Sequence, residues 1–316
     1  MIRVGIIGLG AVGDRLLKQF VHHPKTEVVA ICDTNRERLQ LIKKELQDVE
    51  LYDDYKNLLL NPEIDLVYVA VPPKFHHQIV LATAKAGKHI LCEKPLANSY
   101  VEAQEMHEAV KEARVIHAIN FPLAYNDAVW ELKRRVKEKT IGEIKRIELT
   151  MHFPDWPRVW QQNPWIAGRE QGGFIREITP HYLQVIVELF GEIKHVQSFI
   201  EYPNHPSSCE TGVIARLELV NGNTILIDGL SGVGRKEEIL FKIYGEKGTI
   251  ALKNWSVLEG ENKDQERAII DVPVNNELQD LISEIVNAIN GEKARLITFK
   301  EGLDIQKVLE QLLESE

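Results

Sequence analysis

The chain has little cysteine and no pattern of metal ligands. Its three cysteines are widely spaced and form no Cys-x-x-Cys pair, so neither a disulfide framework nor a thiolate metal site is predicted. The histidines include two adjacent pairs. Adjacent residues on a helix do not face one point, so neither pair is suited to bind one metal ion. We therefore expect no bound metal. The residues concerned are Cys32, Cys92 and Cys209, and His22, His23, His76 and His77.

Long apolar runs and a basic charge balance are also absent. No run is long enough to span a bilayer, and the first residues, MIRVGIIGLG, are typical of a strand and turn rather than a leader peptide. The formal net charge of -9 argues against a nucleic-acid partner, which would favour a basic face. We expect a cytoplasmic protein whose partner is a small-molecule substrate, with no nucleic acid and no membrane.

The pattern of elements changes once along the 316 residues. Up to about residue 120, apolar strand patterns alternate with helical patterns, as in βαβ units with a parallel sheet. Beyond it, segments such as 212–230 and 239–252 carry hairpin signals that indicate an antiparallel sheet with helices on one face. We predict an α/β protein of two domains. Residues 1–120 would form a doubly wound parallel sheet. Residues 121–316 would form an α+β domain with a mostly antiparallel open sheet, and the C-terminal helix could pack back on the first domain.

A glycine pattern, Gly8-x-Gly10-x-x-Gly13, separates the first strand from the first helix. Glycines at this spacing permit a tight turn, close approach of the backbone to a pyrophosphate and close packing of helix on strand. The helix N-terminus, at Ala11 and Val12, would offer unpaired N–H groups to the phosphates. The pattern predicts a Rossmann domain that binds a dinucleotide. The alternative is a glycine-rich turn without a ligand.

The second strand ends in an acid, Asp33, which lies twenty residues after Gly13 and is followed by Thr34. A carboxylate there accepts hydrogen bonds from ribose hydroxyls and repels a 2′-phosphate, which favours NAD. Arg36 and Arg38 lie close behind. They could pair with a phosphate, so NADP stays open, or they could be solvated helix arginines.

The tripeptide Glu93-Lys94-Pro95 directly follows a buried strand. Ligands of open parallel sheets lie at the carboxyl ends of the strands. A lysine at this position could reach a substrate oxygen. A surface charge pair of Glu93 and Lys94 is equally compatible with the position.

The segment GGFIREITPHY, residues 172–182, places a carboxylate four residues before an imidazole. Thr179 is a good N-cap and Pro180 suits the first helical position, so we predict that His181 lies in the first turn of a helix. A helix N-terminus disfavours imidazolium, which would keep the ring neutral and able to accept a proton. The alternative is a histidine that caps a helix against the core.

An irregular stretch, residues 154–173, is rich in tryptophan and arginine. Its aromatic faces suit stacking on a sugar ring, and Arg158 could bind a carboxylate or phosphate. The same side chains could instead plug a loop onto the sheet. Trp165 and Arg169, nearest the glycine pair, are the better candidates for substrate contacts.

Together, the glycine pattern, VPPKFHH at 71–77, AGKHILCEKPLA at 86–97 and GGFIREITPHY at 172–182 resemble the Gfo/Idh/MocA oxidoreductases. The similarity runs through essentially the whole chain. It implies a Rossmann domain followed by a domain whose open sheet mediates oligomerisation, and hence a homodimer or homotetramer.

The resemblance also implies roles for single residues. Lys94 matches the lysine that contacts cofactor and substrate, and His76 rather than His77 matches the histidine after the proline-rich turn. His181 matches the histidine of the second-domain motif, whose usual Asp is here Glu177. The implied cofactor contacts are Gly8, Gly10, Ala11, Val12, Gly13, Asp33, Thr34, Val71, Pro72, His76, Glu93, Lys94 and Asn120.

These observations predict an NAD(P)-dependent oxidoreductase that moves hydride between a nicotinamide and a carbinol carbon of a sugar, cyclitol or related polyol. His181 would take the hydroxyl proton, Lys94 would polarise the oxygen and Glu177 would position the substrate or the lysine. Arg176 beside Glu177 would weaken that carboxylate as a base. An imine or carboxylate-bearing substrate held by Arg169 or Arg176 therefore stays open, as does a regulator that binds the dinucleotide without catalysis.

Overall fold

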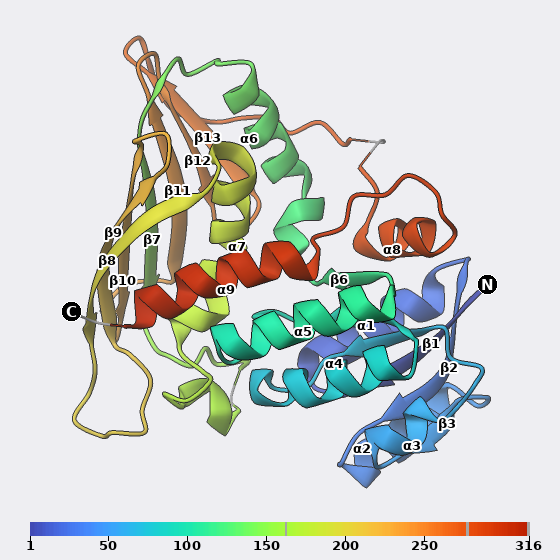
Figure 1. Cartoon of the computed structure of the whole chain (residues 1–316). Coiled ribbons are helices and arrows are strands. Elements are labelled where there is room, and N and C mark those ends of the chain that lie inside the picture. The colour runs from blue at the N-terminus through green and yellow to red at the C-terminus, as the bar shows by residue number, and fades with distance from the viewer. Residues whose placement is uncertain (162, 276–277, 315–316) are drawn as a thin grey trace. The chain divides into compact units, whose positions relative to one another are not determined.

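The structure, a computed structural model, describes residues 1–161, 163–275 and 278–314 (Figure 1). The chain divides into two compact units: Met1–Asn120 with Gln279–Gln306, and Phe121–Leu278 with Lys307–Glu316. Within the described ranges, every helix is too short or too polar to cross a bilayer.

The first unit is built on a parallel sheet with the strand order β3-β2-β1-β4-β5-β6. This is the order of a Rossmann fold, and its direction reverses between β1 and β4, where such sheets bind their ligands. Side chains of β4 and β5 are almost all fully buried, because helices cover both faces of the sheet. The strands are β1 (Ile2–Ile7), β2 (Thr26–Cys32), β3 (Glu50–Tyr52), β4 (Leu66–Val69), β5 (His89–Cys92) and β6 (His117–Ile119).

The helices of the first unit follow the strands as βαβ units require. Asn35 caps α2, since its side chain accepts a hydrogen bond from the N–H of Arg38 at 3.1 Å. Near the C-terminus α8 returns to this unit, and Ser283 meets His23 at 3.2 Å. The helices are α1 (Ala11–His22), α2 (Arg36–Glu45), α3 (Tyr55–Leu59), α4 (His76–Lys85), α5 (Tyr100–Ala113), α8 (Leu281–Ile289) and the first part of α9 (Phe299–Leu313).

The second unit is built on a sheet with the order β14-β13-β12-β11-β7-β10-β9-β8. It is mostly antiparallel, as predicted, and only the central pair β7 and β10 is parallel among its described strands. Helices α6 (Asp127–Lys137) and α7 (Phe174–Phe190) cover one face (Figure 1). The strands are β7 (Ile144–Phe153), β8 (Ile193–Glu201), β9 (Gly212–Leu219), β10 (Thr224–Ser231), β11 (Glu238–Gly245), β12 (Thr249–Lys253), β13 (Val257–Asn262) and β14 (Gln265–Ile269).

The predicted start of the histidine helix is wrong. Helix α7 begins at Phe174, so Pro180 is its seventh residue rather than its first, and His181 does not lie in the first turn. A proline inside a helix costs about 3 kcal/mol. Burial offsets this cost, because Phe174, Ile178 and Tyr182 lie on the sheet side and are at most 1% exposed.

Candidate functional site

The glycine turn after β1 contains two glycines that the fold requires and one that it leaves open. Gly8 has a φ of +95°, and a Cβ there would lie 2.6 Å from the carbonyl group of Ala70. A Cβ on Gly13 would lie 2.1 Å from the carbonyl oxygen of Gly8. A Cβ on Gly10 would meet nothing within 4 Å, and the residue is exposed at the N-terminus of α1. Gly10 therefore offers the open backbone that a pyrophosphate needs.

The acid at the end of β2 is tied to this turn. One carboxylate oxygen of Asp33 accepts a hydrogen bond from the N–H of Leu9 at 2.8 Å. The two nearby arginines pair with other acids. Arg36 lies 2.6 Å from Asp53, and Arg38 lies 3.7 Å from Asp14. The arrangement favours a ribose diol at Asp33 over a 2′-phosphate.

A buried carboxylate, Glu93, lies at the end of β5. It accepts hydrogen bonds from the Tyr68 hydroxyl at 2.5 Å and from the Asn120 amide at 2.6 Å. Burial raises the pKa of Glu93, and the two hydrogen bonds oppose that shift. The interpretation of Glu93 as a surface charge is therefore wrong. The contacts hold the loop in which Lys94 follows, with a cis peptide bond to Pro95.

His76 ties together the loops that follow β4 and β5. Its Nε2 lies 2.8 Å from the carbonyl oxygen of Val71, and its Nδ1 lies 3.1 Å from that of Pro95. The ring is 0% exposed, and burial lowers its pKa against the opposing effect of these carbonyl groups. His76 thus holds the loops that carry Pro72 and Lys94.

The predicted cofactor residues all come to one edge of the parallel sheet. They lie in the loops after the carboxyl ends of five strands, or in the first turns of the helices that follow. In chain order they follow β1 (Gly8, Gly10, Ala11, Val12, Gly13), β2 (Asp33, Thr34), β4 (Val71, Pro72, His76), β5 (Glu93, Lys94) and β6 (Asn120).

In the second unit, packing explains the glycine pair before α7. A Cβ on Gly172 would lie 2.3 Å from the carbonyl oxygen of Ile166. Gly173 has a φ of +95°, and its Cβ would lie 2.1 Å from a carboxylate oxygen of Glu210. That carboxylate accepts a hydrogen bond from the N–H of Ile175 at 2.7 Å. Glu210 thus acts as the cap that Gly173 cannot supply, which is why α7 starts here.

His181 is held by aromatic rings rather than by the start of a helix. It lies seven residues after Phe174, and the field of a helix terminus falls off within the first turn. His181 is 6% exposed, and its ring lies edge-to-face with two aromatic rings. The ring centroids are 5.7 Å apart for Phe121 and 5.2 Å apart for Trp255, and the ring planes meet at 88° and 85°. The predicted effect of the helix N-terminus on this imidazole is therefore wrong.

Glu177 and His181 lie one turn apart on α7 and so share a face of the helix. Glu177 is 7% exposed and accepts a hydrogen bond from the Gln161 side chain at 3.2 Å. Sequence reasoning missed Gln161, because a glutamine in an irregular loop has no periodicity that marks it as buried. A buried carboxylate one turn from an imidazole can orient a hydroxyl group and exchange its proton.

Arg169 and Arg176, the two arginines predicted to bind substrate, contact one another, and each also interacts with a residue before β9. The guanidinium of Arg176 donates to the carbonyl oxygen of Arg169 at 3.2 Å. Burial lowers the pKa of Arg176, while the charge of Glu210 opposes this. The Arg169 guanidinium lies 3.5 Å above the ring of Tyr202. Arg176 therefore faces the residues before β9. Adjacent helical residues point about 100° apart, so Arg176 and Glu177 point in different directions.

The tryptophan-rich stretch serves mainly to close the second unit. Trp156 packs against Phe153 at 4.9 Å, and Arg158 pairs with Glu237 at 2.9 Å. These contacts support the interpretation of a loop plugged onto the sheet. Trp165 is half-buried in a short 3-10 helix, Pro164–Ala167, directly before the glycine pair.

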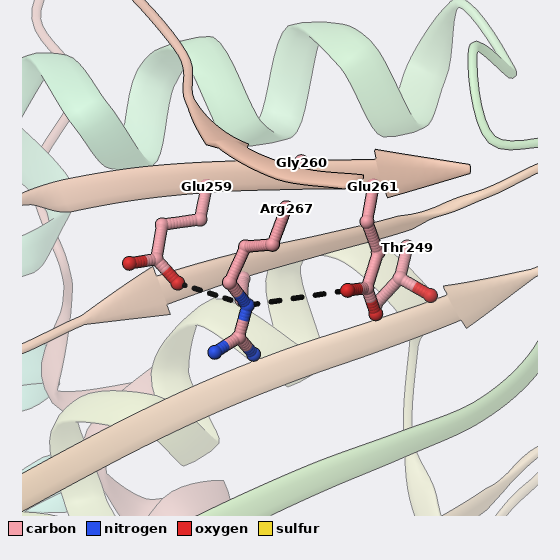
Figure 2. Close-up of a pocket in the computed structure, with 6 residues that line it drawn as sticks. Thr249, Glu259, Gly260, Glu261 and Arg267 are labelled. Atoms are coloured by element: carbon pink, nitrogen blue, oxygen red, sulfur yellow. Dashed lines mark ion pairs between the residues drawn. The ribbon is translucent and has the colours of Figure 1, made fainter. Parts of the chain in front are cut away.

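A shallow depression on the second sheet is a separate feature. It measures about 140 Å³ including open solvent and lies over β12, β13 and β14. Figure 2 shows Arg267 between two carboxylates there, 3.2 Å from Glu259 and 4.0 Å from Glu261. The predicted site residues do not line it, and its arginine is already paired with acids. It therefore plays no part in the candidate site.

Two family profiles match the chain. Residues 2–121 match a family described as oxidoreductase family, NAD-binding Rossmann fold, and residues 129–251 match the GFO/IDH/MocA C-terminal domain.

Similar proteins include two curated dehydrogenases. Levoglucosan dehydrogenase of Pseudarthrobacter phenanthrenivorans is 28% identical over 227 residues, which are 62% of this chain and 57% of that protein. Myo-inositol 2-dehydrogenase of Thermotoga maritima is 30% identical over 191 residues, which are 60% of this chain and 55% of that protein. The chain thus spans little more than half the length of these relatives.

A solved structure shows the same fold over nearly the whole chain. The WlbA dehydrogenase from Bordetella pertussis, in complex with NADH and UDP-GlcNAcA, has a TM-score of 0.85 at 21% identity. The similar region covers 99% of this chain and 96% of the WlbA chain.

The glycine turn predicts that one glycine-to-alanine substitution lowers cofactor affinity and that another lowers stability. We expect Gly10→Ala to weaken NADH binding about tenfold while the melting temperature stays within ~2 °C, because its Cβ enters open space that the cofactor needs. Gly13→Ala should lower the melting temperature by about 5 °C, because its Cβ meets backbone. Fluorescence titration with NADH and thermal unfolding measure both. Equal loss of stability in the two variants would contradict this assignment.

Glu210 predicts a pH dependence of stability. Burial raises the pKa of Glu210 from its ordinary 4.5 to about 7, so the folded state keeps the proton where the unfolded state has lost it. The free energy of unfolding should therefore fall by about 3 kcal/mol as pH rises from about 4.5 to 7, and stay level above.

Urea unfolding at pH 5 and pH 8 tests this dependence. Glu210→Gln should flatten the difference between the two pH values. The exposed Glu192→Gln should leave the difference as in the unsubstituted protein. An unchanged difference in Glu210→Gln would show that other groups cause it.

Proposed function

Because the chain belongs to the Gfo/Idh/MocA oxidoreductase family, we propose that it is an NAD-dependent dehydrogenase or reductase of a sugar, cyclitol or related polyol. The observation that carries the proposal is the buried pair of Glu177 and His181 on one face of α7, within the matched second-domain segment. Residues 1–120 would bind the cofactor, and residues 121–316 would bind the substrate and other copies of the chain. The two curated dehydrogenases act on a sugar derivative and a cyclitol by their names, in keeping with this substrate class.

The proposed chemistry assigns one task to each of three side chains. The loops after β1, β2, β4, β5 and β6 would hold the cofactor, which would supply the hydride acceptor, as NAD, or the hydride donor, as NADH, for the carbinol carbon. His181 takes the hydroxyl proton in the oxidative direction and gives it back in the reverse direction. The Lys94 ammonium stabilises the negative charge that develops on the oxygen. Glu177, held by Gln161, orients a neighbouring hydroxyl group of the substrate.

The arginines support a neutral rather than an acidic substrate. Arg176 faces Glu210 and donates to a backbone carbonyl group, so much of its binding capacity is already used. A carboxylate-bearing substrate would have to compete with these contacts. Trp165 and Arg169 remain the proposed substrate contacts beside the glycine pair, through stacking and hydrogen bonds.

A purely regulatory role is the weaker alternative. Burying a carboxylate and an imidazole costs free energy that a cofactor-binding protein without chemistry need not spend. A protein that binds NADH tightly but turns over no member of a broad panel would nevertheless fit that alternative.

A substrate screen tests the proposal. Absorbance of reduced nicotinamide is followed with sugars, sugar acids, cyclitols and 1,5-anhydro sugars, each with NAD and with NADP. We expect turnover of at least one neutral polyol and a preference for NAD, because Asp33 repels a 2′-phosphate and the nearby arginines are paired with Asp53 and Asp14. Turnover of sugar acids alone would overturn the substrate class.

Substitutions then separate chemistry from cofactor binding. His181→Ala and Lys94→Ala should each lower kcat by about a hundredfold to ten-thousandfold, because a proton acceptor or a charge-stabilising group is lost. NADH affinity should stay within about threefold for His181→Ala. His195→Ala, an exposed histidine on β8, is the matched control. Full activity in both His181→Ala and Lys94→Ala would refute the mechanism.

We further propose that the protein is cytoplasmic and assembles through the open sheet. Its three cysteines are free and buried, in keeping with a reducing compartment. On the sheet, Phe199 of β8 lies opposite Ile214 of β9, and these side chains are 55% and 62% exposed. An apolar cross-strand pair on an uncovered sheet face suits a symmetric interface in a homodimer or homotetramer.

The proposed interface predicts a change of mass in one variant. Ile214→Glu should shift the protein to monomer in light scattering, because the symmetry of the interface places the new charges in one apolar contact. Leu60→Glu, which alters another exposed apolar side chain, this one in the first unit, should leave the mass unchanged. An unchanged oligomer in Ile214→Glu would place the interface elsewhere.

A further inference from the structure

The turn between β12 and β13 holds a tryptophan in an unfavourable backbone conformation. Trp255 has a φ of +75°, and Asn254 before it has a φ of +46°. Asparagine tolerates this left-handed region, but a bulky side chain rarely adopts it. Hairpin turns with two residues of positive φ strongly prefer glycine at the second position, so a tryptophan there is the unusual feature.

The hairpin imposes the conformation: the N–H of Ser256 donates to the carbonyl oxygen of Lys253 at 3.3 Å, and a type I′ turn requires positive φ at both central residues. Two further hydrogen bonds fix Asn254 to the start of β11. The N–H of Asn254 donates to the carbonyl oxygen of Ile239 at 2.8 Å. The side-chain oxygen of Asn254 accepts from the N–H of Ile239 at 3.0 Å. The turn is therefore held to a central part of the sheet, and Trp255 follows from a fixed point.

The strained turn brings the indole to the helix that carries the proposed acid–base pair. Its ring centroid lies 5.2 Å from that of His181 at 85°, and 5.5 Å from that of Tyr182 at 36°. The imidazole also meets Phe121 edge-to-face. Rotation of a histidine ring about χ2 has a broad, shallow preference, so ring contacts of this kind restrict where its nitrogen atoms point.

We propose that Trp255 is a positioning residue that holds the His181 imidazole in the orientation for proton transfer. The proposal rests on the proposed role of His181. A base must lie within hydrogen-bond reach of the proton it takes, and a displacement of 1 Å can cost about a hundredfold in rate. Trp255 is partly exposed, whereas His181 is buried, so the indole also covers the imidazole on that side.

Three variants test the proposal. Trp255→Asn removes the ring but keeps a residue that accepts positive φ, so the turn survives. Trp255→Phe keeps an aromatic ring. Lys139→Asn is the matched control, because Lys139 is another non-glycine residue with positive φ in the same unit and has an exposed side chain.

We expect Trp255→Asn to lower kcat about tenfold or more, with KM and NADH affinity changed less than about threefold. Trp255→Phe should recover most of that loss, and Lys139→Asn should have wild-type kinetics. An unchanged kcat in Trp255→Asn, or a loss that Trp255→Phe does not recover, would overturn the proposal.

A second measurement does not need turnover. The measurement is NMR of protein with isotope-labelled histidine, in which the signal missing from His181→Ala identifies His181. The His181 ring carbons should show exchange broadening in Trp255→Asn but not in Trp255→Phe. A sharp His181 signal in both variants would refute the positioning role even if kcat fell. If no polyol is turned over by any form, the proposed function fails, and the ring signal still decides whether Trp255 holds His181.

Discussion

The hydrogen bond from the N–H of Ile175 to the buried carboxylate of Glu210 determines the geometry of the second unit. It satisfies a backbone group that α7 would otherwise leave unpaired and so sets where the helix begins. From that start, the helical period of 3.6 residues places Glu177 and His181 on one face and turns Arg176 away. The glycine pair follows from the same contact, because Gly173 can have no side chain against Glu210.

The first unit relies on the same device of buried polar side chains that hold functional loops. Glu93 is fixed by Tyr68 and Asn120, and His76 bridges the loops after β4 and β5. Burying such groups costs free energy unless each is hydrogen-bonded, and here they are. The result is that Lys94, half-buried beside Glu93, starts from a rigid backbone. Rigid support of this kind is what precise placement of a charge requires. The strained Trp255 turn plays the corresponding part for His181.

Local patterns predicted much of this architecture. The alternating strand and helix periods gave the parallel sheet, whose strand order confirms a Rossmann fold, and the hairpins at 212–230 and 239–252 form β9–β10 and β11–β12. The start of α7 was predicted wrongly, because Thr179 and Pro180 make a good local helix start and only a distant carboxylate overrules it. The elements that were missed are the strands β3, β8, β13 and β14 and the helices α3 and α8. The buried role of Glu93 was left open for the same reason as Gln161, since a polar residue in a loop has no period that reports burial.

The sequence by itself determined the family, the two-part fold and the chemical types at the site, because these are written in short-range periods, glycine spacing and motif residues. Only the tertiary structure decided how the side chains of α7 are held. Glu210 lies 35 positions after Ile175 and Trp255 lies 74 positions after His181, so no local pattern can pair them. The contacts arise because β9 and the β12–β13 turn belong to the sheet that α7 covers, and burial then makes each polar or aromatic group find a partner.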